Sequence, residues 1–181
     1  MKTSKEYRIP YLGLKLATHQ YQFAPDRKFF EEFEFTEIHD CNLVVNVELE
    51  KQSTMIIIRT ELQGTVQTTC DHCGDNLSVE IATNQQLIVK FGDSTGNTDD
   101  DILVLGPSEH EVDLSQYIFE YAHLALPARH VHESEQDCDQ EALKRLAVYK
   151  VDTTANTQWA ELKNLNYEDP EDNEFFNDEE E

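Results

Sequence analysis

Two cysteines at CxxC spacing, Cys70 and Cys73, are the residues best suited to chemistry in this chain. Thiolates at this spacing can place both sulfurs on one tetrahedral ion, and Gly74 lets the backbone turn directly after them. They supply half of a zinc site. Zinc also accepts three cysteines with one histidine, so the complete candidate set is Cys70, Cys73, His132 and Cys138. The alternative is a reduced pair that binds no metal.

The second half of this candidate site lies far along the chain. His132 follows Cys73 by 59 positions and precedes Cys138 by six, a looser arrangement than a compact zinc finger or ribbon uses. His72 and His130 are further candidate ligands by residue type alone. A full site therefore requires the fold to bring the cysteine turn and the later segment together.

Other catalytic motifs are missing from the sequence. There is no GxSxG, no glycine-rich phosphate loop and no HExxH. The CxxC leads into Gly74 and a β-type segment, so no helix N-terminus lowers the pKa of a thiol as a redox site requires. We therefore predict that the protein is not an enzyme. A thiol oxidoreductase that uses Cys70 and Cys73 is the enzymatic alternative.

Hydrophobic residues at every second position predict the strands that carry the cysteine turn. We expect a meander of three or four antiparallel strands, with the cysteines at the turn of a long hairpin. Gly64 is expected to mark a bulge or bend in the strand before the turn. The alternating positions are Leu43, Val45, Val47 and Leu49, then Ile56, Ile58, Thr60 and Leu62, and finally Leu77, Val79, Ile81, Leu87, Val89 and Phe91.

Helical spacing of hydrophobic residues predicts one main helix at about residues 114–126. Asp113 is its expected N-cap, Gln116 is the partner in a capping box, and Pro127 ends the helix. This helix should lie across the sheet and close the core. The shorter helices that we expect follow Asp26, follow Asp139 and cover residues 157–165.

These elements predict an α+β protein. We expect a curved antiparallel β-sheet or partly open barrel, with one main helix across it and short helices towards the C-terminal end. At 181 residues the chain should form a single domain over 1–165. Residues 92–101 are expected to be an acidic loop. Residues 166–181 carry nine acids and no Lys or Arg, so we expect a disordered acidic tail.

The charge of the chain restricts its partners. The formal net charge is −23, and every neutralised phosphate needs a nearby Lys or Arg, so direct RNA binding is disfavoured. The best local basic cluster is formed by Lys144, Arg145 and Lys150. An acidic protein of this kind is better suited to attract a basic protein partner.

Membrane association and secretion are not expected from the sequence. No stretch approaches the ~20 apolar residues that span a bilayer, and the polar segment 1–8 leads into no apolar signal region. We therefore expect a cytoplasmic protein. Its cysteines should then be reduced, which favours metal binding over disulfides.

Several motifs in a fixed order resemble the YceD family, also called the large ribosomal RNA subunit accumulation proteins. The resemblance covers roughly residues 5–165, and the segment 129–132 with the single Cys138 is similar to the form found in Bacteroidetes-type bacteria. The motifs are Phe29-Phe30, the hydrophobic hairpin, Thr69-Cys70-Asp71-His72-Cys73, Glu111-Val112-Asp113-Leu114 at the start of a helix, Leu126-Pro127 and Trp159-Ala160-Glu161-Leu162.

The resemblance implies a role in ribosome biogenesis without an established reaction. We expect a non-enzymatic factor that contacts a ribosomal precursor through a basic ribosomal protein or assembly factor. Many members of the family carry more cysteines after the Leu-Pro element, whereas this chain has only Cys138 there. A structural zinc-binding adaptor unrelated to ribosomes is the main alternative.

Overall fold

The computed structural model describes residues 5–93, 96–99 and 101–149. Contacts divide the chain into one compact unit, Met1–Leu143, and a second that begins at Lys144. Of the second unit, the structure describes only the residues up to Tyr149. Both sheets and all candidate site residues belong to the first unit.

The described elements alternate between strands and a few short helices. A 3-10 turn at Lys5–Tyr7 precedes the first strand. The strands are β1 (Arg8–Pro10), β2 (Thr18–Phe23), β3 (Asp40–Lys51), β4 (Met55–Thr69), β5 (Asn76–Phe91), β6 (Gly96–Asp99), β7 (Ile102–Leu105) and β8 (Glu111–Asp113). The helices are α1 (Arg27–Glu31), α2 (Ser115–Leu124) and α3 (Gln140–Tyr149).

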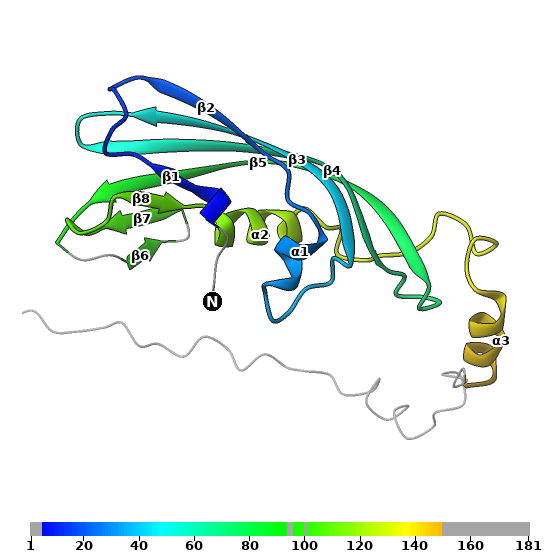
Figure 1. Cartoon of the computed structure of the whole chain (residues 1–181). Helices are drawn as coiled ribbons and strands as arrows, with labels where there is room; N and C mark the ends of the chain where they lie inside the picture. The colour runs from blue at the N-terminus through cyan, green and yellow to red at the C-terminus, as the bar shows by residue number, and fades with distance from the viewer. Residues whose placement is uncertain (1–4, 94–95, 100, 150–181) are drawn as a thin grey trace, which may run out of the picture. The chain divides into compact units, whose positions relative to one another are not determined.

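Six strands form one open sheet in the order β2-β3-β4-β5-β7-β6. The long strands arch over α2 in Figure 1, so the prediction of an α+β fold with a curved sheet and one helix across it is confirmed, while the sheet is not closed into a barrel. Two details were wrong. β7 pairs parallel to β5, and part of the expected loop at 92–101 forms β6, which pairs with β7.

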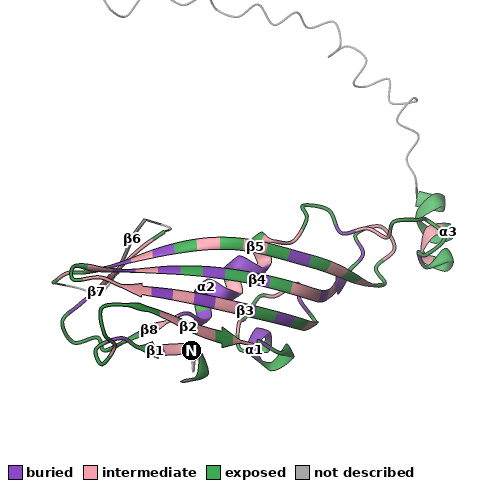
Figure 2. Cartoon of the chain, turned by 90° about the horizontal axis from the view of Figure 1, so that it is seen from above, coloured by how far each residue is buried: buried purple, intermediate pink, exposed green. Residues whose placement is uncertain are grey.

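The hydrophobic core lies between the main sheet and α2. Figure 2 shows buried and exposed residues alternating along the strands, as expected for a sheet with one covered face. Phe91 breaks the predicted pattern, since 43% of it is exposed at the end of β5. The sheet contributes to the core the buried residues Leu43, Val45, Val47, Leu49, Ile56, Ile58, Leu62, Val66, Ile81, Leu87 and Val89.

The N-terminal segment completes the start of α2. β1 pairs with β8 in a separate two-stranded sheet, and the Leu114 amide donates to the carbonyl of Tyr7 at 3.0 Å. The predicted N-cap was wrong by one residue, because Leu114 occupies that position and makes no side-chain cap bond. The Asp113 carboxylate still accepts from the Ser115 amide at 3.0 Å. The capping box itself was wrong, because the Gln116 side chain donates to Glu120.

Of the bulge or bend predicted at Gly64, the bulge was wrong. The β3–β4 register runs through Gly64 without a shift, so there is no bulge there. Its φ is +145°, and a Cβ at this position would lie 2.1 Å from the carbonyl oxygen of Asn42. A glycine is needed because the two strands approach each other too closely for any side chain.

Some predictions lie outside the described residues. These are the helix at 157–165, Lys150 in the basic cluster and the acidic tail at 166–181, so the 1–165 domain boundary stays a prediction. Within the described part of the chain, no helix has the length and apolar character needed to cross a membrane.

Candidate metal centre

The turn between β4 and β5 holds the two CxxC cysteines in a tight backbone conformation. The Cys70 amide donates to the Asp75 carbonyl at 2.8 Å, and the Gly74 amide donates back to the Cys70 carbonyl at 2.9 Å. Gly74 has a φ of +80°, which a side chain would disfavour. The hairpin strands therefore continue into a closed turn that presents both sulfurs.

A second segment docks on this turn through Asp71. The Asp71 amide donates to the His130 carbonyl at 2.7 Å, and the His130 amide donates to the Asp71 carboxylate, also at 2.7 Å. These two bonds join residues that are 59 positions apart in the chain. They bring His132, two residues further on, to the cysteine turn.

Cys138 reaches the same place through a short turn ahead of α3. The Asp137 amide donates to the Ser134 carbonyl at 3.0 Å, and the Cys138 amide donates to the Glu135 carbonyl at 3.3 Å. The Asp139 carboxylate accepts from the Glu141 amide at 2.8 Å, which caps the helix as predicted. The last ligand candidate is thus fixed between a turn and a helix start.

The four predicted ligand atoms converge within 4.8 Å of one another, in the set Cys70, Cys73, His132 and Cys138. His132 Nδ1 lies 3.7 Å from Cys73 Sγ and 3.6 Å from Cys138 Sγ. Four donors at 2.0–2.3 Å from a tetrahedral ion lie roughly 3.5–3.8 Å apart. The two separations between His132 Nδ1 and the sulfurs therefore fit a tetrahedral metal site.

The other nitrogen of His132 fixes the orientation of its ring. Nε2 lies 3.3 Å from the carbonyl oxygen of Asn76, at the first residue of β5. A carbonyl only accepts, so the Nε2 atom carries the proton, and the Nδ1 lone pair is left to accept a thiol proton or to bind a metal among the sulfurs. Metal-binding histidines commonly use their second nitrogen in this way.

The thiols have unequal acidities. Cys70 is only 1% exposed, and burial alone would raise its pKa, but backbone amides of Cys73 and His72 donate to its sulfur and lower the pKa to about 6. Burial and the neighbouring thiols raise the pKa of Cys138 to about 12. The negative charge of one thiolate thus disfavours deprotonation of the next thiol. A bound cation would offset this repulsion.

A family model described as large ribosomal RNA subunit accumulation protein YceD matches residues 58–166 of this chain. The chain belongs to the YceD family. The match covers more than half of the sequence and includes all four converging residues, in agreement with the resemblance of the motifs. The YceD description names an accumulation protein rather than a class of enzyme. No curated protein and no solved structure matches the chain.

Two other histidines predicted as candidates in this YceD-family chain do not join the set. His72 Nδ1 lies 4.0 Å from Cys138 Sγ, but His72 is not among the four residues whose ligand atoms all lie within 4.8 Å of one another. His130 is buried, and its Nε2 has no hydrogen-bond partner among the described residues. His130 contributes through its backbone, since its amide and carbonyl both bind Asp71.

Sequence reasoning missed the two residues that assemble the site. Asp71 lies inside the CxxC motif and Asn76 begins the following strand, so each has the type and position of an ordinary turn residue. Their contacts with His130 and His132 connect segments that no short-range pattern links. The available signal was Asp71 itself, an acidic residue between the candidate ligands Cys70 and Cys73.

Proposed function

We propose that this protein is a non-enzymatic factor in ribosome biogenesis that supports accumulation of large-subunit ribosomal RNA. The observation that carries the proposal is the YceD family match over residues 58–166. Such a role places the protein in the cytoplasm, where thiols stay reduced and available to a metal.

Zinc is the metal we propose for the Cys70, Cys73, His132 and Cys138 set. Three thiolates and one imidazole suit zinc, and a complete four-ligand shell is typical of structural sites rather than catalytic ones, which keep an open position. Two of the four ligands are buried, since Cys70 is 1% and Cys138 6% exposed, whereas Cys73 and His132 are half-buried. The ion would cross-link the hairpin turn to the 130–138 segment and supply no reaction.

The partner we propose is a basic ribosomal protein or assembly factor on a precursor particle. A chain of net charge −23 attracts cationic polypeptides and repels phosphates. Direct RNA contact is therefore the less favoured route. The exposed cations Lys144 and Arg145 on α3 are too few to offset this balance.

A thiol oxidoreductase is a second candidate because one observation favours it. Hydrogen bonds to the Cys70 sulfur lower its thiol pKa to about 6, as a reactive thiolate requires. Its sulfur is, however, buried beside Cys138, where a substrate disulfide has little access. A normal, high thiol pKa measured for Cys70 and Cys73 in metal-free protein would exclude this candidate.

Metal content and particle binding test the proposal together. We expect about one zinc per chain in protein purified without chelator, and its loss in Cys138→Ser, with the same chain co-sedimenting with large-subunit precursor particles. A zinc protein that never co-sediments would favour an adaptor unrelated to ribosomes. If wild-type protein contains no metal, the zinc cross-link is rejected. The ribosomal role is then tested by co-sedimentation alone.

A further inference from the structure

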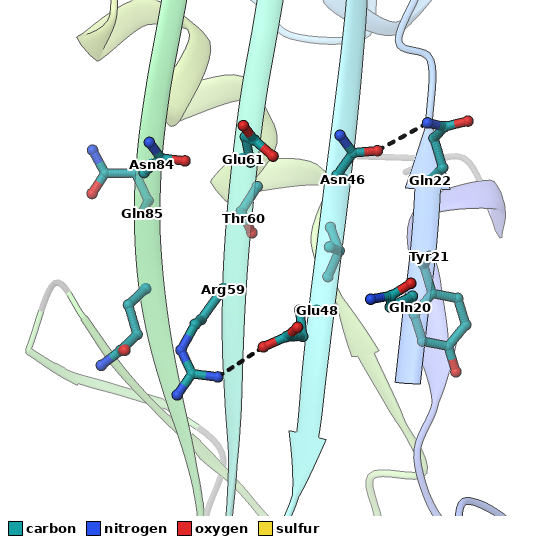
Figure 3. Close-up of a pocket in the computed structure, with 12 residues that line it drawn as sticks. Gln20, Tyr21, Gln22, Asn46, Glu48, Arg59, Thr60, Glu61, Asn84 and Gln85 are labelled. Carbon is teal, nitrogen blue, oxygen red and sulfur yellow. Dashed lines mark hydrogen bonds and ion pairs between the residues drawn. The ribbon is translucent and has the colours of Figure 1, made fainter. Parts of the chain in front are cut away.

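The face of the main sheet opposite α2 carries two rows of polar side chains across the strands β2, β3, β4 and β5 (Figure 3). The strand register aligns them, so neighbours in each row lie side by side. Five of the eight are amides, which offer donors and acceptors without net charge. The rows are Gln22, Asn46, Glu61 and Asn84, and Gln20, Glu48, Arg59 and Gln86.

These rows border a hollow of about 780 Å³ that extends from β2 to β5. Its size falls in the range of sites that take a small ligand or a few residues of a peptide. Polar residues are normal on the water-facing side of a sheet. What distinguishes this face is the combination of a hollow, a lining rich in amides and an uneven distribution of charge.

The one cation in the lining is already engaged. Arg59 Nη1 lies 3.0 Å from Glu48 Oε1 and 3.2 Å from Glu50 Oε2. Glu61, in the other row, is exposed and forms no ion pair with any residue that the structure describes. It lies in register between Asn46 and Asn84. The hollow therefore presents one uncompensated carboxylate between two amides.

The charge of the surrounding face has the same sign. Across β2 to β5 the water-facing positions include more acids than bases, which gives this side of the sheet a negative potential within a chain of net charge −23. Phosphates would be repelled, and cations attracted. The acids are Asp40, Glu48, Glu50, Glu61 and Glu80, and the bases are Arg59 and Lys90.

We propose that this hollow binds an extended, arginine- or lysine-rich segment of a partner polypeptide. Glu61 receives a cationic side chain, and the amides of both rows bond the unpaired backbone N–H and C=O groups of the segment. The proposal rests on the proposed function only for the source of the segment, a basic protein of the ribosomal precursor. The charge complementarity itself is independent of that source.

Binding of a fluorescently labelled arginine–serine repeat peptide to the full chain tests this surface. Glu61→Arg should weaken binding about tenfold, because an attraction becomes a repulsion at the centre of the hollow. Glu111→Arg is the matched control, since it makes the same charge change at an exposed position on β8. We expect the control to stay within about twofold of wild type, as long-range attraction alone changes little.

Equal weakening by both substitutions would overturn the proposal, because the peptide would then be attracted by net charge alone. A labelled single-stranded RNA gives the second opposing outcome. If it binds the wild type more tightly than the peptide does, and binds Glu61→Arg more tightly than the wild type, the proposal is overturned in favour of nucleic acid. Glu61→Gln guards against a folding defect, because it keeps the side-chain shape. It should weaken binding about two- to fivefold, the range of an exposed ion pair.

Co-sedimentation separates this proposal from the proposed function. If Glu61→Arg binds the peptide as well as wild type does while wild type co-sediments with precursor particles, the surface assignment fails and the ribosomal role stands. If peptide binding depends on Glu61 but wild type never co-sediments, the surface stands and the ribosomal role fails.

Discussion

Asp71 and His130 bind each other through two 2.7 Å hydrogen bonds. One uses the backbone of both residues, and the other uses the Asp71 carboxylate. They close a gap of 59 residues and leave His132 facing the cysteine sulfurs. The Asp71–His130 contact therefore supports the position of His132 in the candidate metal centre.

Replacing Asp71 should weaken metal binding without removing a ligand. Asp71→Ala loses the bond from the His130 amide, and residues of this supporting kind typically change metal affinity about 10–100-fold. Zinc affinity by chelator competition measures the effect. Asp75→Ala is the control, since its carboxylate accepts only a local bond from the Asn76 amide. An equal loss in the control would mean that turn charge, rather than the Asp71–His130 contact, is responsible.

Removing the metal should loosen the two joined segments and leave the sheet unchanged. We expect chelation to raise hydrogen exchange at the Asp71 and His130 amides, because both bonds then close a long loop without the cross-link. The amides of β3 and β4 should keep their protection. Uniform loss of protection along the chain would show instead that the ion stabilises the whole fold.

A side chain at Gly64 should destabilise the sheet strongly. In Gly64→Ala the new Cβ meets the Asn42 carbonyl at 2.1 Å on a backbone with φ of +145°, so we expect a loss of about 2–4 kcal/mol. Thermal or denaturant unfolding measures it. Gly13→Ala has open space around it and should stay within about 0.5 kcal/mol of wild type. A mild Gly64 variant would contradict the close approach of β3 and β4.

Stability should decline in alkaline solution. Burial and nearby acids raise the pKa of Cys41 to about 12, and burial raises the pKa of Tyr7 to about 12, so folding favours the neutral forms of both. Their contribution is complete below the unfolded pKa and is lost as pH rises through the folded one. We expect the free energy of unfolding to fall from about pH 9 upward.

Cys41→Ala isolates one part of this pH dependence. It removes the group with the lower unfolded pKa, so the decline should begin nearer pH 10, where tyrosine ionises in an unfolded chain. Unfolding of the zinc-loaded protein across this range measures the change. Identical profiles for wild type and variant would show that folding does not raise the pKa of Cys41.

The strands and the ligand set could be predicted from the sequence because both depend on local information. Alternation identifies β3, β4 and β5 without any knowledge of their neighbours. The zinc-type set could be chosen by residue chemistry, and the structure brings those four side chains together. Whether they bind zinc stays a prediction.

The remaining features depend on contacts between distant segments. Alternation does not encode which strand lies beside which, so the parallel pairing of β7 with β5 was missed. A glycine within a strand is compatible with a bulge or with a close approach, and only the position of Asn42 decides between them at Gly64. The Asp71–His130 contact likewise has no short-range signature.

The pairing of β1 with β8 sets an order for folding during synthesis. The strands β3, β4 and β5 follow one another in the chain and pair with one another, so this meander can assemble as soon as it leaves the ribosome. Arg8 can bind Asp113 only after that residue has been synthesised, 105 residues later. At roughly 5–20 residues per second the delay is about 5–20 s. The N-terminal segment and the metal ligands His132 and Cys138 are thus the last parts of the first unit to find their places.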